Sequence, residues 1–336
     1  MNVIEMANIN FEKHFQLLLK IFLSNEKTFM KNSRRKFLKQ SAVAVAGVSL
    51  LKSKAFASAY ASDHITGIQL YSVRDDMKTP ETALDTLKKL SALGYVYVEH
   101  ANYKDRKFYG YSVTDFKKIL DDNNLKMRSG HTVLNMNHWD DTKNDFTDVW
   151  KNTVEDAAAA GQQYVISPWL DEAYRTKIDS LKKFMDIFNK SGELCKKYNM
   201  KFGYHNHNFE VSTKIENETL YDFILKNTDP NLVAQQMDIG NMYGAGGRAI
   251  EIIKKYPGRF ELMHVKDEIK AAKGEMEEPY ESTVLGKGVL GVKEIVDYAK
   301  KNGGTKDFTI EQESYQGKAP IDCAKEDLEV MKKWGY

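Results

Sequence analysis

Lys201–Glu210 reads KFGYHNHNFE, and this stretch sets a pattern that later parts of the chain share. Its first part, Lys201–Tyr204, has the composition of a short buried strand. The strand runs into the polar residues His205, Asn206 and His207. Imidazole groups bind metal ions, and imidazole and amide groups both form hydrogen bonds to polyols. The stretch therefore predicts a strand whose carboxyl end carries binding groups.

Three later apolar segments end in the same way. Val233–Asp238 ends in an acid, and Phe260–His264 ends in an imidazole that Lys266 follows two residues on. Phe308–Glu311 ends in an acid, and Glu313 follows it at the same spacing. Apolar runs that stop at metal-ligating residue types are typical of a site at the carboxyl ends of parallel strands.

Strand and helix patterns alternate eight times between residue 65 and the C-terminus. The expected strands are 65–71, 95–99, 125–131, 163–167, 201–204, 232–238, 260–265 and 308–311. The expected helices are 80–93, 112–123, 145–160, 177–198, 219–226, 248–256, 292–301 and 321–333. Apolar strands in strict alternation with helices indicate an α/β fold with parallel strands covered by helices. Eight such units in ~250 residues predict a single-domain (β/α)8 TIM barrel.

An open doubly wound sheet is the alternative fold. It would need a glycine-rich phosphate loop after an early strand, and the nearest match, Gly244–Gly247, follows the sixth strand. The longest connection, 266–290, is charged and contains glycine, so we expect a lid or substrate loop there. Five aromatic residues are either surface groups or sugar-stacking groups: Tyr103, Phe108, Tyr109, Tyr111 and Trp139.

Residues 1–57 have the features of an export signal. Ser33–Lys39 reads SRRKFLK, a close match to the twin-arginine signal, and Ser41–Leu51 is apolar but too short to span a bilayer. Ala55–Ala57 then provides a small-x-small cleavage site. We therefore expect a periplasmic protein, with an uncleaved membrane anchor or an N-terminal helix as the alternatives.

Cleavage after Ala57 would leave 58–336 as the barrel domain. Residues 1–29 precede the signal, and we expect Met30 to be the natural start.

Cleavage at this position would also change the charge of the protein. The first 57 residues hold ten of the 49 basic and three of the 47 acidic residues, so the remainder carries a net charge of −5. A mildly acidic protein lacks the electrostatic footprint of a nucleic-acid-binding protein. No segment after the signal is apolar for long enough to span a membrane.

Cys195 and Cys323 lack CxxC spacing and are expected to be buried thiols, with a bridge between them left open.

Polar residues gather at the predicted strand ends, which a barrel would bring to one face. They are Gln69, Arg74, Glu99, Ser129, His131, Ser167, His205, His207, Asp238, Asn241, His264, Lys266, Glu311 and Glu313. A lone histidine in such a place is more often satisfied by hydrogen bonds than by a metal. Ligand types on four successive strands, at His205, Asp238, His264 and Glu311, favour one divalent metal ion instead. Mixed imidazole and carboxylate ligands suit Mn²⁺, Zn²⁺, Co²⁺ or Fe²⁺ better than Ca²⁺, and Mg²⁺ is not distinguished from these.

From about Ile65 to the C-terminus, the chain resembles the xylose-isomerase-like barrels, specifically the sugar phosphate isomerase/epimerase group. The shared motifs are GIQLYSVR (67–74), GYHNHNFE (203–210), MDIGN (237–241), HVKD (264–267), LGKGVLGV (285–292) and IEQE (310–313). The resemblance implies one divalent metal held at His205, Asp238, His264 and Glu311. Epimerases of the group pass a proton between two metal-bound glutamates. Here His205 replaces the glutamate of strand five, which leaves Glu311 as the only matched acid.

The resemblance implies an isomerase- or epimerase-like enzyme that removes a proton next to the ketone of a keto sugar. The expected catalytic residues are Glu311, His205, His207, Glu99 and Lys266. The expected substrate-binding residues are Gln69, Arg74, His131, Asn206, Asn241 and Glu313. Two alternatives stay open: a lyase that acts on 3-keto-glycosides by β-elimination, and an exported sugar-binding protein without catalysis. In each case the partner is a small sugar or glycoside.

Overall fold

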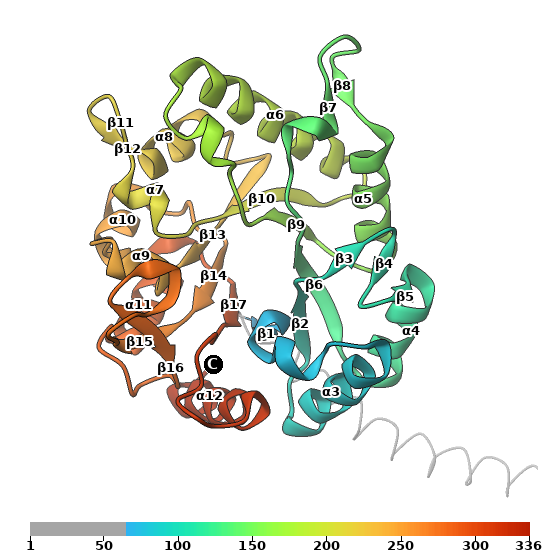
Figure 1. Ribbon diagram of the computed structural model, residues 1–336, viewed down its shortest axis with the longest axis vertical. Helices are drawn as coiled ribbons and strands as arrows, with labels where there is room; N and C mark the ends of the chain where they lie inside the picture. The colour runs from blue at the N-terminus through green and yellow to red at the C-terminus, as the bar shows by residue number, and fades with distance from the viewer. Residues whose placement is uncertain (1–64) are drawn as a thin grey trace, which may run out of the picture. The chain divides into compact units, whose positions relative to one another are not determined.

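The computed structural model describes residues 65–336, and the predicted signal segment lies outside the described residues. Export, cleavage and periplasmic location therefore stay predictions. Eight parallel strands close into one barrel, in which each strand pairs with the previous and the next barrel strand of the chain (Figure 1). They are β1 (Ile65–Gln69), β2 (Tyr97–His100), β6 (Lys126–His131), β9 (Tyr164–Ser167), β10 (Lys201–His205), β13 (Val233–Asp238), β14 (Leu262–Val265) and β17 (Asp307–Ile310). The predicted TIM barrel is confirmed.

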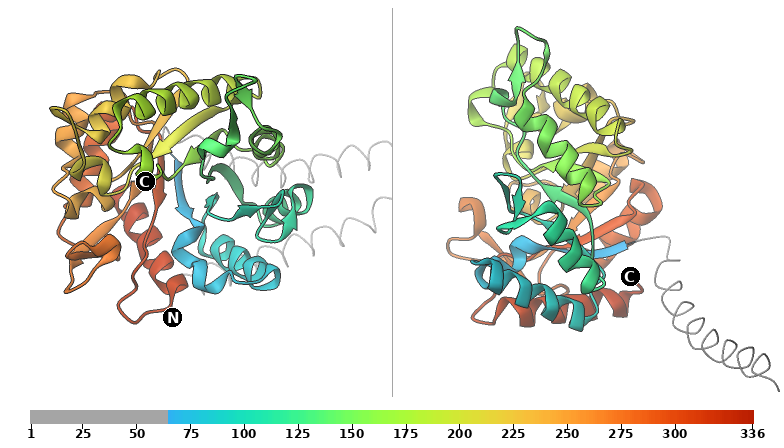
Figure 2. Two further views of the ribbon diagram at one scale, coloured as in Figure 1. Left: turned by 45° about the horizontal axis from the view of Figure 1, so that its top comes forward. Right: turned by 90° about the vertical axis from the view of Figure 1, so that its right-hand side faces the viewer.

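A helix follows each barrel strand and covers the outside of the barrel. The eight are α3 (Pro80–Leu93), α4 (Val113–Asp122), α5 (Asp148–Ala159), α6 (Ile178–Lys196), α8 (Leu220–Asn227), α10 (Ala249–Lys255), α11 (Val292–Tyr298) and α12 (Pro320–Trp334). The long helix α6 packs against β10, and Figure 2 shows it on the outer side of the barrel. No helix within 65–336 combines the length and the apolar character needed to cross a bilayer.

Local sequence signals set the ends of these helices. The hydroxyl of Thr79 accepts a hydrogen bond from the backbone N–H of Thr82, and Pro80 occupies the first turn of α3. Gly94 ends α3 in the left-handed conformation, with φ = 100°. The first strand is shorter than predicted, because the side chain of Gln69 accepts a hydrogen bond from the N–H of Tyr71 and starts a 3-10 helix, η2 (Leu70–Asp76).

Short antiparallel ladders follow four of the eight barrel strands. They comprise β3 (Tyr103–Lys104), β4 (Lys107–Phe108) and β5 (Tyr111–Ser112) after β2; β7 (Trp139–Asp140) and β8 (Asp145–Phe146) after β6; β11 (Lys214–Ile215) and β12 (Glu218–Thr219) after β10; and β15 (Asp267–Lys270) and β16 (Tyr280–Thr283) after β14. The connection 266–290, predicted as a loop, is therefore largely a β-hairpin. Its tip carries the 3-10 turn η5 (Glu275–Glu277).

Most of the aromatic residues proposed for sugar stacking pack against the chain itself. Phe108 and Tyr109 are buried and stack on Phe116, at centroid distances of 5.5 and 5.7 Å. The hydroxyl of Tyr111 donates to the carbonyl of Pro80. A sugar-stacking role is therefore wrong for Phe108 and Tyr109, because both rings belong to the core. Both cysteines are buried free thiols, so the bridge between them does not form.

Gly130 of β6 lies in close contact with a side chain of the neighbouring strand β2. A Cβ atom at this position would lie 1.8 Å from Cδ2 of His100, whose buried ring packs edge-on against Phe108. We predict that Gly130→Ala lowers the free energy of unfolding by about 1–3 kcal/mol, the usual cost of overpacking a core. Denaturation in urea measures this change. The double variant His100→Ala/Gly130→Ala should be no less stable than His100→Ala alone, and an additive loss in the double variant would contradict the packing argument.

Candidate metal centre at the strand ends

The barrel register brings four ligand-type residues together. Asp238 of β13 pairs with His264 of β14, and His205 of β10 pairs with Gln236 of β13. Glu311 follows the last residue of β17, and its N–H donates to the carbonyl of Val265. One ligand atom from each of the four residues lies within 4.8 Å of the others, and all four side chains are buried. Bonds of about 2.2 Å to one ion place two ligand atoms at most about 4.4 Å apart, so small shifts would allow all four to bind one ion.

Asp238 shows that a cation fits this cluster. Its Oδ1 atom accepts a hydrogen bond of 2.7 Å from the N–H of Asn241. Its Oδ2 atom is buried and has no hydrogen-bond partner among the described residues. That oxygen lies 3.7 Å from Nδ1 of His264 and 4.0 Å from Nε2 of His205. A buried carboxylate oxygen without a partner costs free energy, which a bound cation would remove.

His264 is oriented by two carboxylates. Its Nδ1 lies 2.9 Å from Oε2 of Glu311, and its Nε2 lies 2.6 Å from Oε1 of Glu99. Burial would raise the pKa of Glu99, but the neighbouring His131 and His264 hold it well below its usual range. Glu99 is therefore an anion that accepts the Nε2 proton of His264. This leaves Nδ1 facing the cluster, as is usual for a metal-binding histidine with a carboxylate behind it.

Glu99 is itself held by three donors. The amides of Gln69 and Gln236 donate hydrogen bonds of 2.7 and 2.8 Å to its two oxygens, and the hydroxyl of Ser129 donates as well. The sequence predicted Glu99 as a catalytic residue and Gln69 as a substrate-binding residue. In the structure Glu99 bonds to Nε2 of His264, the nitrogen away from the cluster, and Gln69 donates to Glu99. Both residues therefore orient the cluster.

Gln236 fixes the protonation state of His205. Because the Gln236 amide nitrogen donates to Glu99, its oxygen must face the histidines, and it lies 3.1 Å from Nδ1 of His205 and 2.7 Å from Nε2 of His131. His205 therefore carries its proton on Nδ1, which leaves the lone pair of Nε2 toward Asp238. Burial, and after it the neighbouring His264, lower the pKa of His205 well below its usual value, so the ring is neutral. A neutral imidazole with a free lone pair is the form that binds a metal.

Sequence reasoning missed Gln236. A signal was present, because Gln236 and Asp238 are two residues apart in a strand and so share a face. His131, predicted to bind substrate, contacts the same network: its ring stacks on His264 at 5.2 Å, and its Nε2 lies 3.2 Å from Glu99.

Lys266 places a buried positive charge beside the cluster. Its Nζ donates to Oδ1 of Asn241 at 2.9 Å and to Oε1 of Glu313 at 2.5 Å. It also lies 3.3 Å from Glu275 and 3.7 Å from Oε2 of Glu311. Burial opposes the charge, but the surrounding carboxylates, Glu313 above all, raise the pKa of Lys266 well above its usual value. Glu275 comes from the β15–β16 hairpin, so this connection does reach the site. Lys266 and Glu99 have separate sets of partners, although both lie beside the cluster.

Three further predicted residues surround the cluster. The side chain of Asn206 bonds to both the N–H and the carbonyl of Asp238, at 3.0 and 3.1 Å, so it joins β10 to β13. Arg74 donates to the carbonyl of Glu313. The half-buried His207 has its ring 5.0 Å from that of His205 and 5.4 Å from that of Trp169, a half-exposed residue that sequence reasoning did not select.

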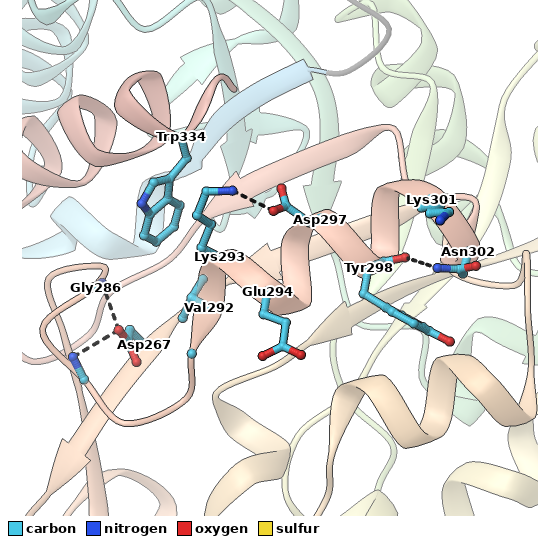
Figure 3. A pocket seen from close by; sticks show the side chains of 12 residues that line it. Asp267, Gly286, Val292, Lys293, Glu294, Asp297, Tyr298, Lys301, Asn302 and Trp334 are labelled. Atoms are coloured by element: carbon cyan, nitrogen blue, oxygen red, sulfur yellow. Dashed lines mark hydrogen bonds and ion pairs between the residues drawn. The ribbon is translucent and has the colours of Figure 1, made fainter.

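Two pockets differ in their relation to this cluster. The larger one, about 770 Å³, lies beside α11 and the end of α12, and its side chains include Asp267, Lys293 and Trp334 (Figure 3). None of the four candidate ligands lines it, and the carboxylate of Asp267 is bonded to loop N–H groups. A second pocket, about 440 Å³, is lined by His131 and so contacts the network of the cluster.

Similar proteins include an inosose dehydratase and a sugar phosphate isomerase/epimerase. An inosose dehydratase of Clostridium perfringens is 33% identical over 101 residues, which are 30% of this chain and 33% of that protein. The chain thus matches only about a third of the length of this relative. The crystal structure of a sugar phosphate isomerase/epimerase from Parabacteroides distasonis has a TM-score of 0.65 at 26% identity, covering 80% of this chain and 98% of that one.

A crystal structure of an IOLI protein with a bound zinc atom shares the fold. Its TM-score is 0.63 at 17% identity, and the match covers 80% of this chain and 99% of that one. Residues 87–334 match the family described as the xylose isomerase-like TIM barrel. This range contains the second to the eighth barrel strand and all four candidate ligands. The chain therefore belongs to the xylose isomerase-like TIM barrel family.

Proposed function

We propose that this protein is a divalent-metal-dependent enzyme that removes a proton from the carbon next to the ketone of a sugar, in the manner of an isomerase or epimerase. The observation that carries the proposal is the unpartnered, buried Oδ2 atom of Asp238 among three further ligand-type residues. When bound, a divalent ion would polarise the ketone and stabilise the negative charge that forms on its oxygen. The metals that suit this donor set are Mn²⁺, Zn²⁺, Co²⁺, Fe²⁺ and Mg²⁺.

The chain's own residues supply the proton transfer. Glu311 is the acid that the resemblance matches, and the pKa of this buried group is kept low, mainly by His264 and Lys266, so it is a carboxylate able to accept a proton. The ammonium of Lys266, 3.7 Å from Glu311, adds positive charge where the substrate oxygen becomes negative. Return of the proton to the same or a neighbouring carbon completes an isomerisation or epimerisation.

A lyase is the second candidate, and two observations favour it. A matching relative is named as a dehydratase, and His205 stands where the epimerases of the group keep a second glutamate. In a lyase the first step is the same removal of a proton by Glu311. The electron pair of the broken C–H bond then forms a double bond, and the oxygen substituent on the next carbon leaves with a proton.

The metal proposal predicts one divalent ion per chain. We expect His264→Ala and Asp238→Ala each to lose most of the bound metal, because each removes a ligand from a closed set. Elemental analysis of the purified variants measures this loss. His138→Ala, which changes a histidine outside the cluster, should keep the wild-type content. Full occupancy in both ligand variants would contradict the assignment.

Glu311 is predicted to be the base. Glu311→Gln keeps the size of the side chain but cannot accept the proton, so deuterium exchange between D₂O and a keto sugar should slow by about 10²–10⁴-fold. Metal content is measured on the same samples, and Glu277→Gln, an exposed change on the hairpin, is the control. If Glu311→Gln keeps its metal and exchanges at the wild-type rate, the base is another residue, with His205 the next to test.

Lys266 is predicted to act on catalysis and on stability through separable effects. Lys266→Met should lower kcat more than it changes KM, and it should cost about 3–5 kcal/mol of unfolding free energy, because Glu313 and Glu275 lose their partner. Lys266→Met/Glu275→Gln should recover part of the stability and none of the activity. Urea denaturation and steady-state kinetics on the same samples separate the two effects. Recovery of kcat in the double variant would mean that Lys266 only balances charge.

A further inference from the structure

The pocket at His131 extends away from the candidate metal centre. Four parts of the chain form it: 101–105 after β2, 131–133 at the end of β6, His138, and the first turns of α5 with Val149 and Thr153. His131 is the member of the histidine cluster that keeps some exposure, at 11% of its side chain, whereas His205 and His264 are buried. A ligand in this pocket therefore contacts His131, which bonds to Gln236 beside the candidate metal centre. The other residues that line the pocket lie outside that centre.

The walls of this pocket are held in place before any ligand binds. Asp156 of α5 accepts hydrogen bonds from the hydroxyl of Tyr103 at 2.6 Å and from the guanidinium of Arg106 at 2.7 and 3.0 Å. These bonds tie the β3–β4 turn to α5. The turn residues Asp105 and Arg106 both have positive φ, at 51° and 59°, which fixes the direction of the turn. A preorganised wall lowers the cost of ordering the site on binding.

The chemistry of the walls suits an uncharged polar ligand. Asn102 and Thr132 supply neutral hydrogen-bonding groups, and Val133 and Val149 supply apolar surface. The charged residues Lys104 and Asp105 have opposite signs. Phosphate recognition normally uses several cationic or N–H donors. Here the one lysine stands beside an aspartate, Nε2 of His131 bonds to Gln236, and burial lowers the pKa of His138. The mixture of polar and apolar groups resembles the lining of small-molecule sites that bind neutral ligands.

We propose that the substrate is an uncharged glycoside, whose keto ring lies at the metal centre and whose attached sugar unit lies in the pocket formed by 101–105, 131–133 and α5. This inference rests on the proposed function, and it adds the substrate class. A free monosaccharide would leave the pocket empty. A phosphorylated monosaccharide would place its charge against a wall that offers no net positive charge.

The test compares three substrates in D₂O: a 3-keto-disaccharide, the matching 3-keto-monosaccharide, and that monosaccharide as its phosphate. We expect the wild type to exchange its proton with the disaccharide at a kcat/KM about tenfold or more above the other two, the size of effect that one well-filled pocket gives. Val149→Trp should remove most of that preference by filling the pocket, and the rate on the monosaccharide should not change. Val289→Trp is the matched control, because Val289 is similarly exposed, at 52% against 61%, and does not line the pocket.

Asn102→Ala gives a second variant with a smaller side chain. It should raise KM for the disaccharide about three- to tenfold without changing KM for the monosaccharide, since one hydrogen bond contributes about 1 kcal/mol. Equal kcat/KM for the disaccharide and monosaccharide, or a preference for the phosphate, would overturn the inference. So would equal losses on both sugars in the two pocket variants.

The failure of the proposed function would look different. If the wild type exchanges no proton with any of the three sugars, the enzyme proposal fails, and the pocket is then tested by calorimetric binding of the disaccharide. Weaker binding by Val149→Trp than by Val289→Trp would support the pocket as the site of the second sugar unit. Equal binding by the two variants would overturn it.

Discussion

The buried carboxylate of Asp238 is the constraint on which the site depends. One oxygen is satisfied by the N–H of Asn241, and the other has no hydrogen-bond partner among the described residues. The surrounding groups hold Asp238 in this position: Asn206 bonds to its backbone on both sides, and Lys266 bonds to the side chain of Asn241. A fold that uses buried polar groups to fix an unpaired carboxylate gives up stability there, which is expected of a site built to receive a cation.

The barrel and the four candidate ligands were predictable because each depends on local sequence. Apolar strands that end in His205, Asp238, His264 and Glu311 need only parallel pairing to converge, and the closed barrel provides it. The groups that set the chemistry of those ligands depend on contacts between distant strands. Gln236 determines the tautomer of His205, and Glu99 determines which nitrogen of His264 faces the cluster, through contacts that no single segment encodes.

Where the structure differs from what the sequence suggested, the differences have similar physical causes. Charge and glycine in 266–290 suggested a lid or substrate loop with no strands, whereas backbone pairing between β15 and β16 organises it and brings Glu275 to Lys266. Phe108 and Tyr109 were candidates for sugar stacking because aromatic residues cluster there, but tertiary packing on Phe116 buries them. Asn206 lies within a run of ligand types, yet its amide bonds to the backbone of Asp238 and of His207. Burial, which the local pattern does not determine, decides each of these cases.

The replacement of a glutamate by His205 gives this member of the family its own character. In the proposed mechanism, a neutral histidine held by Gln236 would bind the metal, and it would not accept a substrate proton while its lone pair is used for coordination. Proton transfer would then depend on Glu311 and on groups outside the ligand set. The proposed metal site is tested most directly by an anomalous difference map from a crystal of the protein loaded with Mn²⁺. We expect one peak about 2.0–2.3 Å from ligand atoms of His205, Asp238, His264 and Glu311. A peak elsewhere, or full loading in solution without a peak at this cluster, would contradict it.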